Sequence, residues 1–85
     1  MTMKQEFTID LKGVRAASTL HRKLATALPL PADYGRNFDA FYDVLTEYGA
    51  NWKITFVNAT AAPEPLRAVC ADAQAETPGL EIVFA

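Results

Sequence analysis

The stretch that decides the fold is LPADYGRNFDAFYDVLTEYG, residues 30–49. It begins with two turn-forming residues, Pro31 and Gly35, and continues with Asn37, a residue type favoured at the N-cap of a helix. The apolar residues that follow recur at helical spacing and stop at a glycine, as is typical of a helix terminus. These apolar residues are Phe38, Phe41, Leu45 and Tyr48. The stretch therefore predicts a turn followed by one amphipathic helix that packs on a core.

The segments on both sides of this helix alternate between strands and helices. They are a strand at 6–11, a helix capped by Ser18 and stopped by Pro29, a strand at 52–57, a helix at 64–76 and a strand at 80–84. Strands separated by helices require crossover connections, so the order β-α-α-β-α-β predicts a parallel sheet. We expect one α/β domain over residues 1–85, in which a three-stranded parallel sheet packs against three helices in two layers.

Composition narrows the class of function. The chain has 85 residues, of which 51% are hydrophobic, and a formal net charge of -2. A nucleic-acid-binding protein usually carries a basic patch, so this weakly acidic chain argues against a nucleic acid as the partner. The sequence shows no secretory signal and no apolar run of bilayer length. We therefore expect a cytoplasmic protein with no membrane contact.

The counts of histidine, cysteine and serine argue against most kinds of catalytic site. His21 is the only histidine, Cys70 the only cysteine and Ser18 the only serine. One histidine and one cysteine cannot form a zinc cluster, and Ser18 is better placed as a helix cap than as a nucleophile. We expect Cys70 to be buried and His21 to be partly exposed, with no metal and no cofactor. A pair of carboxylates acting as acid and base is the enzyme alternative that counting leaves open.

A second stripe of the central helix is polar and acidic. Asp39, Tyr42, Asp43 and Thr46 stand at i, i+3, i+4 and i+7, so they share one side of the helix, away from the apolar stripe. Two like charges at i and i+4 cost a helix about 0.2–0.5 kcal/mol. Residues that break a local rule often mark function, although charged helix faces are usually only solvated. The spacing alone leaves both interpretations open.

At this point the sequence resembles the barstar family, intracellular inhibitors of a secreted bacterial ribonuclease. The matching residues are Leu30, Pro31, Tyr34, Gly35, Asn37, Asp39, Ala40, Asp43, Leu45 and Thr46. The resemblance implies a barstar-like fold and an immunity-type protein, monomeric when free, that binds a secreted or toxin ribonuclease in a 1:1 complex. It further implies that the second helix and the preceding loop enter the ribonuclease active site, where carboxylates imitate RNA phosphates. The implied partner-binding residues are Asp33, Tyr34, Gly35, Asn37, Asp39, Tyr42, Asp43, Thr46 and Asp72.

Several residues depart from the family pattern. Asp33 is an acid where the type member has an aromatic contact residue, Arg36 replaces an acid, and Glu47 replaces a glycine. The stretch 58–63 looks too short for a short helix that the type member has there.

We also expect Gly35 to supply a positive φ angle and Trp52 to pack in the core or at the sheet edge. The fold expectation stands, and a binding module for a different cationic protein is the alternative function.

Overall fold

The structure, a computed structural model, describes residues 4–85, which form three α-helices and three strands in the predicted order. The elements are β1 (Gln5–Asp10), α1 (Ala17–Ala27), α2 (Phe38–Tyr48), β2 (Trp52–Val57), α3 (Glu64–Glu76) and β3 (Glu81–Phe84). Two short 3-10 turns, η1 (Gly49–Asn51) and η2 (Ala59–Ala61), flank β2. No helix in this part of the chain is long and apolar enough to span a bilayer. The predicted α/β class and the order β-α-α-β-α-β are confirmed.

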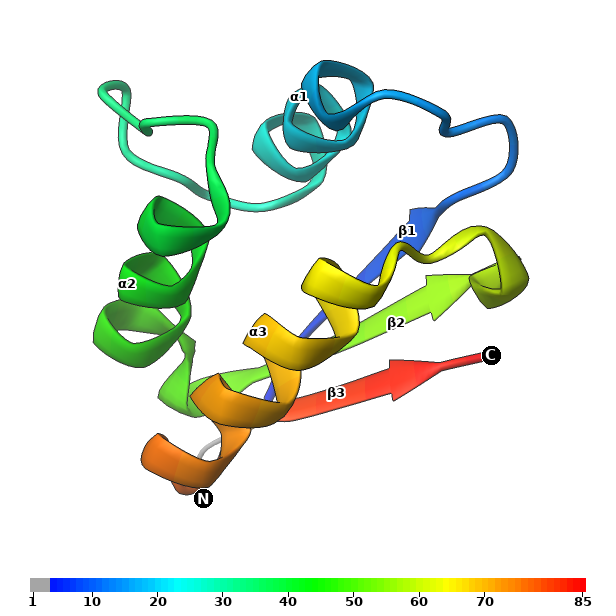
Figure 1. Cartoon of the computed structure of the whole chain (residues 1–85). Coiled ribbons are helices and arrows are strands. Elements are labelled where there is room, and N and C mark those ends of the chain that lie inside the picture. Colours follow the sequence, from blue (N-terminus) through cyan, green and yellow to red (C-terminus); the bar gives the residue numbers. More distant parts are fainter. Residues whose placement is uncertain (1–3) are drawn as a thin grey trace.

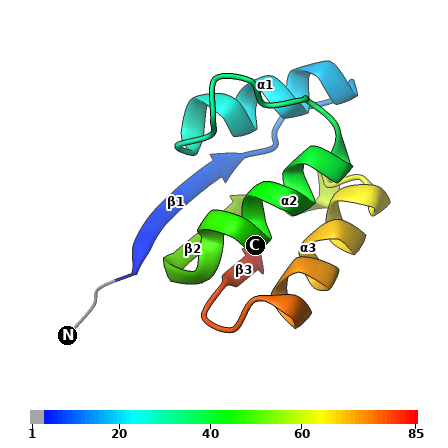
Figure 2. The same cartoon turned by 90° about the vertical axis from the view of Figure 1, so that its left-hand side faces the viewer.

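The strands form one parallel sheet in the order β1-β2-β3, with β2 in the centre (Figure 1). The register places Ile54 of β2 between Phe7 of β1 and Ile82 of β3. Because side chains alternate along a strand, these three residues share one face, and the helices cover that face (Figure 2). The other face carries exposed side chains such as Thr8 and Val83. The predicted two-layer arrangement is therefore confirmed.

The core fills the space between the covered face of the sheet and the helices. Its largest fully buried side chains are Phe41, Phe56, Leu11, Leu20, Leu24, Leu45, Ile54, Leu66, His21 and Cys70. Trp52 is only 4% exposed and makes an edge-to-face contact with Phe7, with 5.4 Å between the ring centroids. The expected packing role of Trp52 is thereby confirmed.

The predicted caps of the two first helices have different outcomes. Asn37 caps α2 as predicted, because its side chain accepts a hydrogen bond from the Ala40 N–H at 2.7 Å. The prediction that Ser18 caps α1 is wrong, since the N-cap is Ala16, which makes no side-chain cap bond. The Leu20 N–H already donates to the Ala16 carbonyl, so Ser18 lies inside the first turn. A cap residue must precede that turn, and the chain turns into the helix two residues before the serine.

The stretch 58–63 contains a helical turn after all. Asn58 adopts a left-handed conformation with φ 56°, and the 3-10 turn η2 follows it. The expectation that this stretch is too short for a helical segment is therefore wrong, because a 3-10 turn needs only three residues. Arg67 of α3 donates to the Ala59 carbonyl at 2.6 Å, and its guanidinium lies 4.7 Å from the ring centroid of Phe84. These contacts join η2, α3 and β3 at the carboxyl end of the sheet.

Candidate partner-binding surface

Helix α2 has one side in the core and one side in solvent. Its buried residues are Phe41, Val44 and Leu45. On the other side Asp39 and Asp43 are exposed, and Tyr42 and Thr46 are partly buried beside them. The Thr46 hydroxyl donates to the backbone carbonyls of Tyr42 at 3.0 Å and Asp43 at 3.2 Å. The four residues of the polar stripe thus lie on the side of α2 to which their spacing assigns them.

The two carboxylates of this stripe are free of ion pairs. Within residues 4–85 the side-chain ion pair is Lys4–Glu81, at 3.4 Å, which links the residue before β1 to β3 and does not involve α2. Neither Asp39 nor Asp43 makes a side-chain hydrogen bond to another residue of this part of the chain. Asp39 lies in the first turn of α2, where the helix dipole favours an acid, whereas Asp43 lies one turn further on. Both carboxylates are therefore available to a cationic partner.

The loop of residues 29–36 leads into α2 and forms one wall of a shallow hollow beside it. The hollow has a volume of about 250 Å³. Its lining residues are Pro31, Asp33, Tyr34, Gly35, Ala40, Asp43, Val44, Glu47 and Tyr48. The structure therefore brings four of the predicted site residues together, namely Asp33, Tyr34, Gly35 and Asp43. It places Asp39 and Asp72 outside this hollow, on the first turn of α2 and on α3.

Tyr48 ends the predicted apolar stripe, and its position in the sequence allows it either to close the core or to border the acidic side of α2. It is 52% exposed at the end of α2 instead of facing the core. The space beneath this end of the helix is already filled, because Leu80 and Trp52 lie against the neighbouring Gly49. The Tyr48 ring consequently lines the hollow together with Glu47. Glu47 was not predicted for the site, although it stands four positions after Asp43 and so follows the helical spacing of the acids.

The turn before α2 also differs from the expectation. Gly35 does not have a positive φ, and Arg36 takes the left-handed conformation instead, with φ 54°. Space at position 35 favours a glycine, because a Cβ there would lie close to the Ala40 Cβ, at 3.3 Å, and to the Asn37 amide nitrogen, at 3.4 Å. That amide also donates to the Gly35 carbonyl at 3.3 Å. Both the nitrogen and the oxygen of the Asn37 side-chain amide thus take part in joining the turn to the helix.

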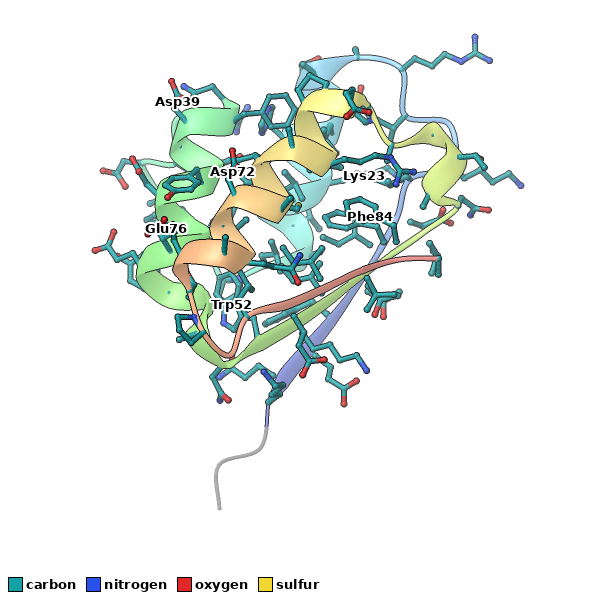
Figure 3. The ribbon with its side chains drawn as sticks, turned by 60° about the horizontal axis from the view of Figure 1, so that its bottom comes forward. Lys23, Asp39, Trp52, Asp72, Glu76 and Phe84 are labelled. Carbon is teal, nitrogen blue, oxygen red and sulfur yellow. The ribbon has the colours of Figure 1, made fainter. Side chains whose placement is uncertain are left out.

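Helix α3 adds exposed acids beside those of α2. The two helices pack against each other, and Figure 3 shows Asp72 and Glu76 on the side of α3 that lies next to α2, with Asp39 near the start of α2. Asp72 and Glu76 are both exposed. Glu76 was not predicted, and its signal is again the spacing of four residues from Asp72. We use the term acidic surface for the exposed residues Asp33, Asp39, Asp43, Glu47, Asp72 and Glu76.

A buried histidine of α1, His21, contacts the loop and the start of α2 beneath this surface. His21 is 2% exposed, which corrects the expectation of partial exposure, because the loop and the start of α2 cover that side of α1. Its Nδ1 lies 2.6 Å from the Tyr34 hydroxyl in a hydrogen bond. Burial lowers the pKa of His21 below its usual value and raises the pKa of Tyr34 to about 12. Both side chains are therefore neutral in the folded protein at neutral pH.

Comparison with protein-family models matches residues 4–84 to the family described as Barstar (barnase inhibitor). The match covers nearly the whole chain. The chain belongs to the barstar family. A search of the curated proteins finds no match. Asp33 and Glu47 both line the hollow beside α2.

The remaining reactive group of this barstar-family protein lies away from the acidic surface. Cys70 is fully buried on α3, as expected, and burial raises the pKa of its thiol to about 12. A thiol with so high a pKa is a poor nucleophile at neutral pH. Among residues 4–85 no group of three histidine, cysteine, aspartate or glutamate side chains could hold a metal ion. What the exposed side chains offer is a set of rigid acceptors for a cationic partner.

Proposed function

We propose that this barstar-family protein inhibits a ribonuclease by placing its acidic surface in the ribonuclease active site, in a 1:1 complex. The observation that carries the proposal is the pair Asp39 and Asp43, exposed one helical turn apart and free of ion pairs within the described residues. The description of the family as a barnase inhibitor supports it. The protein itself needs no catalytic chemistry for this role, and we propose that it is not an enzyme.

The physical basis is phosphate mimicry. A ribonuclease must bind the phosphates of RNA, so its active site carries cationic groups. Carboxylates form short, charge-assisted hydrogen bonds with arginine and lysine, about twice as strong as neutral ones. The buried side of α2, formed by Phe41 and Leu45, fixes the helix before binding, so little conformational entropy is lost in the complex. An acidic surface also speeds encounter with a basic cleft, to about 10⁸–10⁹ M⁻¹s⁻¹ at low salt.

The other site residues divide between contact and shape. The Tyr42 ring lies between the two acids in the sequence and, as a partly buried aromatic residue, is suited to an anchoring contact. The Thr46 hydroxyl donates to the α2 backbone, which leaves its oxygen as an acceptor for the partner. Asn37 and Gly35 are assigned to shaping the turn, because the Asn37 side chain is bonded to Ala40 and Gly35. Asp72 is assigned to the rim of the interface.

The test uses barnase as the first probe. Purified protein is mixed with barnase, and RNA cleavage and the dissociation constant are measured for the wild type, Asp43→Asn and the matched control Glu6→Gln. Glu6 is an exposed acid on β1, on the open face of the sheet, so the control removes the same charge away from the acidic surface. We expect Asp43→Asn to weaken binding by more than about tenfold and Glu6→Gln by less than about twofold.

The outcomes are distinct. Unchanged inhibition by a folded Asp43→Asn protein would contradict the assignment of the acidic surface. No binding of barnase by the wild type would direct the search to the second candidate, a different cationic protein as the partner. That candidate is favoured by one observation, the three carboxylates of Asp33, Asp43 and Glu47 around the hollow. A pull-down from cells with Asp43→Asn as the control, followed by an RNA cleavage assay of the captured protein, separates the two.

The proposal includes the setting of the free protein. We propose a monomer in the cytoplasm, with no nucleic acid and no membrane as its partner. The acidic surface supports the exclusion of nucleic acid, because its carboxylates would repel RNA phosphates. Sedimentation of the free protein and fractionation of cells that express it test these two points.

A further inference from the structure

We infer that His21 is a positioning residue for partner binding, which, through Tyr34, holds the loop 29–36 in the shape that the ribonuclease recognises. This inference rests on the proposed function and names a residue that makes no contact with the partner, because His21 is buried on α1. The loop carries Asp33 and leads directly into the helix that carries Asp39. A change in the path of the loop therefore changes how two acids of the acidic surface are presented.

The loop is tied to the rest of the protein by few hydrogen bonds. The bonds from its own backbone are local, namely the Tyr34 N–H to the Pro31 carbonyl at 3.0 Å and the Leu30 N–H to the Leu28 carbonyl at 2.8 Å. Within residues 4–85, the bond between the Tyr34 hydroxyl and His21 is the one that links this loop to a residue more than three positions away. Apart from apolar packing of Leu30 and Tyr34, the loop depends on this contact for its position relative to α1.

His21 contacts both segments that carry the acids. Its ring lies 5.8 Å from the Tyr34 ring and 5.0 Å from the Phe38 ring, measured between centroids. Asp33 directly precedes Tyr34 in the chain, and Asp39 directly follows Phe38. Each acid is thus covalently joined to a residue that the histidine contacts. One side chain of α1 consequently sets the spacing between the loop acid and the helix acid.

The environment of His21 requires the neutral ring. Burial is the cause of its lowered pKa, and no charged side chain of the described residues contributes to the shift. The titratable group that contacts the ring is Tyr34, which is itself held neutral by burial. A proton on His21 would therefore create a buried charge without a counter-ion, which is strongly unfavourable. Protonation should push the ring out and release the loop.

The first test removes the hydroxyl of Tyr34 and keeps its ring. Tyr34→Phe is compared with Ile82→Val, a buried change on β3 that costs stability but lies in the sheet, away from the loop. In the free protein we expect amide hydrogen exchange in residues 33–40 to accelerate about fivefold in Tyr34→Phe, with the β2 amides unchanged. Binding to barnase should weaken by about tenfold in Tyr34→Phe and by less than about twofold in Ile82→Val.

The second test changes the histidine and follows pH. His21→Asn offers an amide to the Tyr34 hydroxyl but cannot be protonated. Between about pH 7.5 and about pH 5.5, the affinity of the wild type for barnase should fall more steeply than that of His21→Asn. Because both proteins meet the same probe, titration of barnase itself cancels in the ratio. A residue with a merely structural role would leave the two pH profiles parallel, and parallel profiles would overturn the inference.

The failure of this inference differs from the failure of the proposed function. If barnase does not bind the wild type, the proposed function fails for that target, and the exchange measurement still decides whether Tyr34 positions the loop. Equal exchange of residues 33–40 in the wild type and Tyr34→Phe overturns the inference, whether or not barnase binds. Faster exchange together with unchanged affinity also overturns it, because the loop would then be held without consequence for recognition.

Discussion

Asp43→Asn is expected to stabilise the free protein and to weaken its complex. Asp39 and Asp43 are exposed like charges one turn apart, and their repulsion costs about 0.2–0.5 kcal/mol. Asparagine has nearly the same size and helix propensity, and the Asp43 carboxylate makes no hydrogen bond with another described residue that could be lost. The free energy of unfolding should therefore rise by about 0.2–0.5 kcal/mol. Removal of one partner of a buried charge pair in the complex should cost about 2–5 kcal/mol of binding free energy.

Asp39→Asn provides the matched comparison, because it removes the same repulsion at a different place in the helix. Asp39 lies in the first turn of α2, where the helix dipole stabilises an acid by about 0.3–1 kcal/mol. Neutralisation there removes a favourable and an unfavourable interaction together. The free energy of unfolding should then change by between a rise of about 0.2 and a fall of about 0.8 kcal/mol. The two substitutions thus separate the repulsion between the acids from the interaction of each acid with the helix.

Urea unfolding followed by tryptophan fluorescence measures the stability of each protein, because Trp52 is the only tryptophan and is buried. Titration calorimetry with barnase measures the complex. The gain in stability of Asp43→Asn should disappear at about 1 M salt, where the Debye length is about 3 Å. A loss of stability larger than about 0.5 kcal/mol would show that the Asp43 carboxylate has a structural role, and would refute the reasoning. Equal affinity of the wild type and Asp43→Asn would refute it as well.

Three further predictions concern the scaffold that presents the acidic surface. Gly79 and Gly13 both have a positive φ, but a Cβ on Gly79 would clash with the Ala50 carbonyl, while a Cβ on Gly13 would meet no atom. Urea titration should therefore show Gly79→Ala to be about 1–3 kcal/mol less stable than Gly13→Ala, and equal losses of stability would contradict this. Asn37→Ala should lose about 0.5–2 kcal/mol in the same assay because the α2 cap is removed, and an unchanged urea midpoint would show that the cap contributes nothing. The free energy of unfolding should fall as the pH drops through about 6.5, because the unfolded chain then binds a proton at His21 and the folded chain, in which the pKa of His21 is lowered, does not. A urea midpoint that rises on acidification would contradict this prediction.

The elements of the fold could be predicted because their signals are local. The cap of α2 at Asn37 and its end at Gly49 are encoded locally and the structure reproduces both, and Phe41 and Leu45 of the predicted apolar stripe are buried. The β-branched and aromatic run at 52–57 is likewise a strand over the predicted residues. Parallel pairing follows from the helices between the strands, because each connection must cross the sheet. Local period and connection rules together determine the architecture of so short a chain.

The burial of His21 and the exposure of Tyr48 have a different origin, which is contact between segments distant in sequence. His21 looks like a boundary residue of an amphipathic helix, and only the path of the loop 29–36 over α1 buries it. Tyr48 continues the apolar stripe in sequence, but Leu80 fills the space beneath it from the other end of the chain. Periodicity identifies the side of a helix on which a residue lies. It does not tell which other segment covers that side.

In the candidate site, too, residues on one element could be predicted, and residues brought together from several elements could not. Asp39 and Asp43 could be assigned to one exposed side of α2 from their spacing, because a helix fixes the relative direction of its own side chains. The hollow that joins Asp33 to Glu47 could not be derived in this way, since it depends on how the loop returns to the helix. The contribution of Glu76 depends on the packing of α3 beside α2. Residues on one element are predictable, and the combination of elements requires the structure.

The distribution of charge explains how a nearly neutral protein can present a strongly acidic surface. Six of the ten acidic residues belong to the acidic surface, although the net charge is only -2. Arg36 is the one cation of the loop that leads into α2, and other cations lie away from the acidic surface; Figure 3 shows Lys23 apart from Asp39, on the other side of α3. Lys23 donates to the Asp10 carbonyl at 2.9 Å and Arg67 to the Ala59 carbonyl, so these cations are held by backbone groups at the carboxyl end of the sheet. Because a partner meets the local field and not the total charge, holding Lys23 and Arg67 there keeps these two cations away from the carboxylates of α2, and the acids outnumber the single nearby cation, Arg36.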